Sequence, residues 1–68
     1  MTVSAHHPRC IWRLPTVKVR TGLGRTTIYD LMKEGRFPKS RRIAGVHAVG
    51  WDSVEVEAWI AVQLGEVA

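Results

Sequence analysis

Cysteine, long apolar runs and paired acidic residues are all scarce in this 68-residue sequence, and each scarcity excludes a class of protein. Cys10 is the one cysteine, so the chain cannot form an intramolecular disulfide or a metal site built on several thiolates. His6, His7 and His47 are the side chains that could join it around a metal ion, and two of them are neighbours near the N-terminus. A zinc site and a reactive nucleophile remain the alternatives, but we expect no metal and an inert thiol.

No apolar run approaches the roughly 20 residues that a helix needs to cross a bilayer. The first eight residues also lack the apolar stretch of a secretory signal peptide. We therefore expect a cytoplasmic protein with no membrane partner.

The residue patterns of an enzyme are missing as well. The chain has no Ser/His/Asp set and no pair of carboxylates at a useful spacing. Gly22-Leu23-Gly24 is too short to serve as a phosphate-binding loop. A chain of 68 residues has room for one small domain. We expect no enzymatic activity, no cofactor and no small-molecule substrate.

The basic residues are confined to one part of the chain. They are Arg9, Arg13, Lys18, Arg20, Arg25, Lys33, Arg36, Lys39, Arg41 and Arg42. Asp30 and Glu34 are the only acids in that segment, so it carries a formal charge of +8, whereas the rest of the chain holds four acids and no lysine or arginine. This separation indicates one surface for a polyanion such as double-stranded DNA and another surface that avoids it. A basic surface that serves only solubility is the plainer alternative.

A short first helix is predicted over residues 16–21. Pro15 suits the first turn of a helix, because its φ is fixed and it has no N–H to satisfy. Gly22 can end the helix in the left-handed conformation. Four β-branched residues weaken the helix, so it needs packing partners.

A second helix is predicted between Gly24, which can act as its N-cap, and Gly35, which ends it. The spacing i, i+3, i+4 predicts a buried stripe made of Ile28, Leu31 and Met32. The opposite face carries Arg25, Thr26, Tyr29 and Lys33. Two helices joined by a glycine-containing turn match a helix-turn-helix. A generic helical hairpin is the alternative, but the basic and hydroxyl side chains favour DNA binding.

A β-hairpin is predicted next, with strands at residues 41–44 and 47–51 around a Gly45-Val46 turn. Its first strand is basic. A basic hairpin that follows a helix-turn-helix is typical of a wing, which contacts the phosphate backbone and adds affinity more than sequence choice.

The last helix starts at Asp52, which with Glu55 three residues later makes a capping box. Its predicted buried face consists of Val56, Trp59, Ile60 and Leu64. We expect Trp59 to anchor the core rather than stack on bases, because the acids around it repel nucleic acid. Trp51 is expected to close the core, whereas Trp12 suits either a core lid or an exposed arm.

These elements predict a fold that is mainly α with a small β-hairpin, forming a single winged helix-turn-helix domain over residues 12–64. Residues 1–11 are expected to form a flexible N-terminal arm, and residues 65–68 a C-terminal tail.

Several motifs occur together in an order that resembles one family. They are Arg13-Leu14-Pro15, Thr21-Gly22-Leu23, the Thr-Ile-Tyr block at 27–29, the Phe-Pro-Lys block at 37–39, the Val-Gly-Trp block at 49–51 and Ala58-Trp59-Ile60. Over residues 12–62 the chain is similar to the AlpA family of prophage and genomic-island regulators. These are close in fold to winged-helix excisionases and to the DNA-binding domain of MerR-type regulators.

The resemblance implies that residues 25–33 are the recognition helix and residues 39–47 the wing. It also implies an activity, the regulation of transcription or excision at an integrase locus. The chain departs from the family pattern at Gly24, where serine is usual, at Asp30, where a basic residue is common, and at Ser40, where proline is common. Lys18 and Arg20 stand where the first helix tends to be apolar, and the wing turn is longer by one residue. These departures point to an altered DNA preference or to a loosened first helix.

Placing the second helix in a major groove predicts the contacts. The recognition-helix residues expected at DNA are Arg25, Thr26, Thr27, Tyr29 and Lys33, with Arg25 suited to a bidentate contact with guanine. The residues expected at phosphates from the wing are Arg36, Lys39, Arg41, Arg42 and His47. A single small domain buries little surface, so self-association on adjacent half-sites is expected, by analogy with excisionases.

The function predicted from the sequence is a sequence-specific, nucleoid-associated DNA-binding regulator. An excisionase-type recombination directionality factor is one alternative. A protein-interaction adaptor built on the same fold is another, and salt-sensitive DNA binding separates it from the first two.

Overall fold

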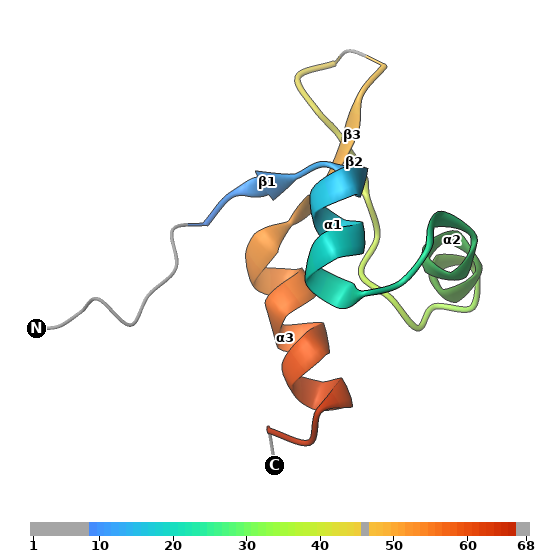
Figure 1. Ribbon diagram of the computed structural model, residues 1–68. Helices are drawn as coiled ribbons and strands as arrows, with labels where there is room; N and C mark the ends of the chain where they lie inside the picture. The colour runs from blue at the N-terminus through green and yellow to red at the C-terminus, as the bar shows by residue number, and fades with distance from the viewer. Residues whose placement is uncertain (1–8, 46, 67–68) are drawn as a thin grey trace, which may run out of the picture.

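The computed structural model describes residues 9–45 and 47–66. Its elements are β1 (Ile11–Trp12), α1 (Leu14–Thr21), α2 (Arg25–Lys33), β2 (Arg41–Arg42), β3 (Val49–Asp52) and α3 (Ser53–Gln63). Three helices and a three-stranded antiparallel sheet make the predicted winged helix-turn-helix domain, and this prediction is confirmed (Figure 1). The predicted turn residue Val46 lies outside the described residues, as do residues 1–8 and 67–68 of the expected arm and tail.

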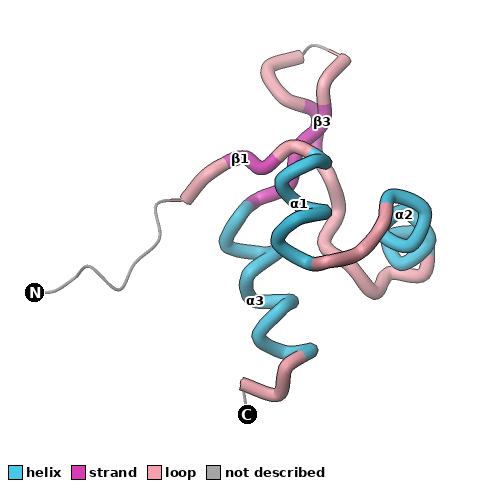
Figure 2. Tube along the Cα trace, in the orientation of Figure 1, coloured by secondary structure: helices cyan, strands magenta, loops and turns pink. Residues whose placement is uncertain are grey.

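The sheet has the order β1-β3-β2, so β3 is its central strand. Trp12 of β1 pairs with Trp51 of β3, and Arg41 of β2 pairs with Gly50 on the other side. The hairpin strands are shorter than predicted, although a hydrogen bond from the Ile43 N–H to the Ala48 carbonyl, 2.9 Å, extends the pairing toward the turn. Helices α1 and α3 pack on this sheet, and α2 stands to one side of them (Figure 2).

Gly50 leaves room for side chains from both sides of β3 to pack over this strand. A β-carbon at this position would overlap the side chain of Ile11 and would lie 2.9 Å from Cδ1 of Ile43. The two isoleucines come from opposite sides of β3, so only a residue without a side chain allows both to lie over it. This packing accounts for the glycine of the Val-Gly-Trp block.

Strand β1 was not predicted, and it changes the account of the expected arm. Within residues 1–11, the structure describes Arg9, Cys10 and Ile11, and all three contact the domain. The Cys10 N–H donates to Ser53 Oγ at 2.8 Å, and the Cys10 carbonyl accepts from the Ser53 N–H at 2.9 Å. Ser53 thereby continues the pairing of β1 with β3 by one residue.

The turn between α1 and α2 is closed by two residues. Gly22 adopts φ 76°, and its N–H donates to the Lys18 carbonyl at 2.8 Å, as the left-handed helix end predicts. The Thr21 hydroxyl donates to the Val17 carbonyl and accepts from the Leu23 N–H at 3.2 Å. Thr21 and Gly22 together fix this turn, and the turn sets the direction of α2 relative to α1.

Helix α2 ends at its predicted glycine. Gly35 has φ 72°, its N–H donates to the Met32 carbonyl, and the Arg36 N–H donates to the Leu31 carbonyl at 2.8 Å. This pair of bonds is a Schellman motif, which satisfies carbonyls that the helix leaves open. On the predicted apolar stripe Ile28 is fully buried, and Leu31 and Met32 pack against the core.

The predicted capping box of α3 is confirmed at Asp52 but not at Glu55. Asp52 accepts a hydrogen bond from the Val54 N–H at 3.0 Å. The Glu55 carboxylate does not complete a capping box, because it binds Arg41. The prediction for Leu64 was wrong: it is the C-cap of α3, just before a second Schellman motif at Gly65, and its side chain is 66% exposed.

Five buried side chains from the helices, from β3 and from the loop after α2 form the core: Val17, Ile28, Phe37, Trp51 and Val56. Trp51 is fully buried and Trp59 packs against the core, as predicted. Trp12 also packs against the core, so it belongs to the domain rather than to an arm.

Two indole groups hold the loop that joins α2 to the hairpin. Nε1 of Trp51 donates to the Pro38 carbonyl at 3.1 Å, and Nε1 of Trp59 donates to the Arg36 carbonyl at 2.7 Å. The ring of Phe37, between these two carbonyls in the sequence, packs edge-on against Trp59 with centroids 4.8 Å apart. The loop is therefore fixed by two indole hydrogen bonds to its backbone carbonyls and by one buried side chain.

Replacing Phe37 with alanine is expected to lower the free energy of unfolding by about 3 kcal/mol, because it removes a buried ring and leaves a cavity. Phe37→Leu keeps most of the apolar contact and should cost about 1 kcal/mol. Urea unfolding followed by tryptophan fluorescence measures both. Val62→Ala, at an exposed position of α3, is the control and should change stability by less than about 0.5 kcal/mol. Equal stability of Phe37→Ala and the control would contradict this account of the loop.

Candidate nucleic-acid interface

The outward face of α2 carries the residues predicted to contact DNA. Arg25, Thr26, Thr27 and Lys33 are exposed, and Tyr29 is half-buried. Helical spacing puts Arg25, Tyr29 and Lys33 in one row, since they are four residues apart. The buried side chain of Ile28 fixes which face of α2 packs on the core and leaves Arg25 and Lys33 exposed.

Arg25 is positioned through aromatic contacts. Its guanidinium carbon lies 5.4 Å from the centre of the Tyr29 ring. That ring meets the buried indole of Trp51 edge-on, with centroids 6.1 Å apart. A guanidinium over an aromatic face is held by a cation–π attraction of about 0.5–1 kcal/mol at an exposed site. Arg25 at the start of α2 is therefore connected through Tyr29 to the buried Trp51.

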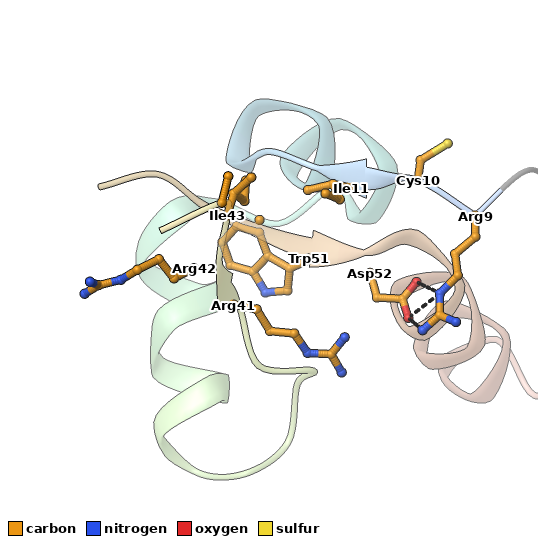
Figure 3. Close-up of a pocket in the computed structure, with 10 residues that line it drawn as sticks. Arg9, Cys10, Ile11, Arg41, Arg42, Ile43, Trp51 and Asp52 are labelled. Carbon is orange, nitrogen blue, oxygen red and sulfur yellow. Dashed lines mark hydrogen bonds and ion pairs between the residues drawn. The ribbon is translucent and has the colours of Figure 1, made fainter. Parts of the chain in front are cut away.

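The pairing register divides the two arginines of β2 between the faces of the sheet. Residues directly opposite each other in an antiparallel pair point to the same face. Arg42 is opposite Val49 and shares a face with Val49 and Trp51, the face on which Tyr29 of α2 packs. Arg41 is opposite Gly50 and lies on the other face, and the two side chains diverge in Figure 3.

The face that holds Arg41 contains a shallow cavity of about 350 Å³ and two ion pairs. Arg41 Nη2 lies 2.6 Å from Glu55 Oε2, and Arg9 Nη2 lies 2.6 Å from Asp52 Oδ2 (Figure 3). Arg9 and Arg41 both line this cavity, and each is therefore paired with an acid. Arg42 makes no ion pair within residues 9–45 and 47–66.

The other residues predicted for the wing are spread along the loop and the turn. Arg36 lies in the loop after α2, and its Nη1 is 3.2 Å from Glu34 Oε1. Both partners are largely exposed, so this pair is weak and can be exchanged for a phosphate contact. Lys39 precedes β2 and His47 follows the turn, and both are exposed.

Sequence reasoning missed two arginines with defined positions. Arg20 of α1 stacks over Trp12, with its guanidinium carbon 5.1 Å from the ring centre. Arg9 binds the cap residue of α3 from a distance of 43 positions. The eight-residue spacing of Trp12 and Arg20 is a possible sequence signal for the first contact, but the second depends on β1, for which the sequence carries no pattern.

The Arg9–Asp52 pair shifts both ionisable groups toward their charged forms. Arg9 donates to both carboxylate oxygens of Asp52, from Nε at 3.2 and 3.1 Å and from Nη2 at 2.6 Å. These bonds lower the pKa of Asp52 most, burial opposes them, and the Val54 N–H and the positive charges of Arg9 and Arg41 add to the lowering. The same bonds raise the pKa of Arg9.

Within residues 9–45 and 47–66, no three His, Cys, Asp or Glu side chains are grouped to hold a metal ion. Cys10 and His47 are both exposed, and His6 and His7 lie outside the described residues. None of the helices in the described part of the chain is both long and apolar enough to cross a membrane.

A helix-turn-helix at α1–α2, followed by the β2–β3 hairpin and packed on α3, makes this chain a winged helix-turn-helix protein. The model of one sequence family, described as the Prophage CP4-57 regulatory protein (AlpA), matches residues 10–64. The chain therefore belongs to the AlpA family of prophage regulatory proteins.

Two relatives are similar over most of the chain. The DNA-binding transcriptional activator AlpA of Escherichia coli (strain K12) is 40% identical over 57 residues, which cover 75% of this chain and 80% of the activator. The uncharacterized protein ORF88 of Enterobacteria phage P4 is 43% identical over 49 residues, which cover 72% of this chain and 54% of the phage protein. No solved structure matches the chain.

The ion pair of Asp52 predicts how stability depends on pH. Because the folded state lowers the pKa of Asp52, the pair stabilises the fold above the pKa of the unfolded chain, about 4, and this contribution is lost as pH falls through the lower, folded pKa. Asp52→Asn keeps a good N-cap residue but removes the charge. The variant should be less stable than the wild type at pH 7, and its stability should fall less between pH 4 and 2.

Thermal unfolding recorded by circular dichroism across this pH range checks the expectation. Glu66→Gln, which removes an exposed carboxylate outside α3, is the matched control and should follow the wild-type profile. Arg9→Ala should reproduce the loss at pH 7 and add little when combined with Asp52→Asn. Superimposable acid profiles of Asp52→Asn and the wild type would refute the role given to this pair.

Proposed function

We propose that this protein is a sequence-specific DNA-binding regulator of transcription, in which α2 reads the major groove and the hairpin contacts the flanking backbone. The observation that carries the proposal is that α2 and Arg42 lie on the same side of the sheet. The register of β2 puts Arg42 on the sheet face against which Tyr29 packs. The 40% identity to a DNA-binding transcriptional activator supports the same function.

In this mechanism the start of α2 enters the groove. Arg25, held over the Tyr29 ring, donates two hydrogen bonds to O6 and N7 of a guanine. Thr26 and Thr27 reach a base edge or a phosphate, and Lys33 binds a phosphate at the far end of the helix. The Tyr29 hydroxyl contacts a phosphate while its ring remains against Trp51.

The hairpin supplies charge without reading sequence. Arg42 contacts phosphates from the side of α2, and Lys39 and His47 extend these contacts along the backbone. Arg36 and Arg41 join them only when their ion pairs with Glu34 and Glu55 open. Affinity is therefore expected to fall linearly in log–log form as salt is added.

Fluorescence anisotropy tests this function directly. The purified chain is titrated onto a labelled duplex from upstream of its own gene and onto a scrambled duplex of the same composition, at several salt concentrations. Tighter binding to the native duplex, with a negative salt slope, supports the proposal. Salt-insensitive behaviour or no binding at low salt refutes it and favours a protein-interaction adaptor on the same fold.

Replacing Arg25 with alanine should cost about 1–3 kcal/mol of binding to the preferred duplex and relax specificity at one base pair. Binding to the scrambled duplex should change much less, because the lost contacts are to a base. Lys18→Ala, which removes an exposed cation from α1, is the control for charge and should leave base preference intact. An equal loss on preferred and scrambled DNA would show that Arg25 contacts only the backbone.

The two arginines of β2 should behave differently. Arg42→Ala should weaken binding to all sequences alike and reduce the magnitude of the salt slope by about one. Arg41→Ala should have a smaller effect, because Glu55 already neutralises this guanidinium. The same salt titrations, performed on both variants, make the comparison. A larger effect of Arg41→Ala would reverse the assignment of the DNA-facing side of the sheet.

We further propose an integrase or excision locus as the target, with a cytoplasmic, nucleoid-associated location. An excisionase-type directionality factor uses the same base and phosphate contacts, so a promoter reporter and an excision assay on the same locus must be compared. Loss of reporter response in Arg25→Ala with unchanged excision favours the transcriptional role. Self-association on adjacent half-sites predicts a sigmoidal titration on a duplex that carries two sites.

A further inference from the structure

Asp30 is the one acidic residue inside α2, and it lies on the outward face of the helix. It is exposed. Thr26 is four residues before it and Lys33 three residues after it, so the three side chains form one row on the helix surface. Ile28 and Met32, each two residues away, point into the domain, which puts Asp30 on the opposite side.

The position of Asp30 is not explained by the fold. Within residues 9–45 and 47–66, its side chain makes no ion pair or hydrogen bond, although Lys33 is one helical turn away. It lies beyond the first turn of α2, so the helix dipole gives it little stabilisation. A carboxylate on the exposed face of a helix proposed to lie in DNA also repels phosphates. These features point to a contact that forms only in the complex.

We infer that Asp30 is a specificity-determining residue that selects a cytosine in the major groove. The inference rests on the proposed function, because it takes α2 as the groove-reading helix. A carboxylate only accepts hydrogen bonds, and the donors on major-groove edges are N4 of cytosine and N6 of adenine. Guanine O6 and N7 and thymine O4 are acceptors, so they repel Asp30.

Cytosine fits better than adenine because of the neighbouring groups. The adenine amine lies between two acceptors, N7 of its own ring and O4 of the paired thymine, whereas the cytosine amine has an acceptor, guanine O6, on one side only. A carboxylate at the cytosine amine therefore meets less repulsion. Asp30 lies five residues after Arg25, or about 7.5 Å along the helix axis, so the cytosine is expected at a different base pair from the guanine read by Arg25.

Selection from a pool of duplexes with a randomised central segment tests this inference. The full chain is compared with Asp30→Asn and Asp30→Ala, and the bound duplexes are sequenced. The wild type should prefer a cytosine by about tenfold at one position, as a single mismatch commonly costs. Asp30→Ala should lose this preference and bind other sequences more tightly. Asp30→Asn should exchange cytosine for adenine, whose N6 and N7 match an amide.

Glu66→Gln removes one exposed negative charge outside α2 and should leave every base preference unchanged. If Asp30→Ala fails to fold by circular dichroism, the isosteric Asp30→Asn decides. A wild-type motif that neither variant alters at any position overturns the inference and leaves the proposed function intact. A wild type that enriches no motif overturns the proposed function, and the role of Asp30 with it.

Discussion

The arrangement of the whole domain depends on how two tryptophan indoles hold the loop after α2. Trp51 and Trp59 donate to the carbonyls of Pro38 and Arg36, and the Phe37 ring is buried between these bonds. Helix α2 contributes the buried Ile28 to the core, and its end is held by the loop that follows it. The indole bonds tie its end to β3 and α3 together, so the helix and the hairpin form one rigid surface.

The same constraint reaches the candidate interface through Trp51. This indole is fully buried, yet its ring touches Tyr29, and Tyr29 supports Arg25. An arginine that is already held over a ring loses less conformational entropy when it binds than a freely rotating one. The core therefore contributes to recognition by limiting where the guanidinium can go, and the residues that stabilise the fold also orient the residue proposed to read a base.

Local chemistry in the sequence was enough to predict the helices and the hairpin, but not the third strand of the sheet. Glycines at positions 22 and 35 and the Asp52 cap act within a few residues, so their effects were visible without the fold. Strand β1 has two residues, and it exists only because β3 pairs with it from 39 and 41 positions further along the chain. Leu64 continued the helical spacing, but it caps the end of α3 and its side chain is exposed. For the interface, the exposed face of α2 was predictable, whereas the separate roles of Arg41 and Arg42 required the register.

The pairing register of the sheet therefore determines both how the sheet packs and which arginine is paired with an acid. A slip of one residue would send Arg42 to the face with Asp52 and turn Arg41 toward α2. Gly50 opposes such a slip, because Ile11 and Ile43 can cover β3 only where no side chain projects. Packing of two isoleucines over a glycine therefore decides which arginine is paired with Glu55 and which stays unpaired within the described residues. The number of basic residues in the sequence overstates the charge offered to a polyanion, since Arg9 and Arg41 are already paired with acids in the folded chain.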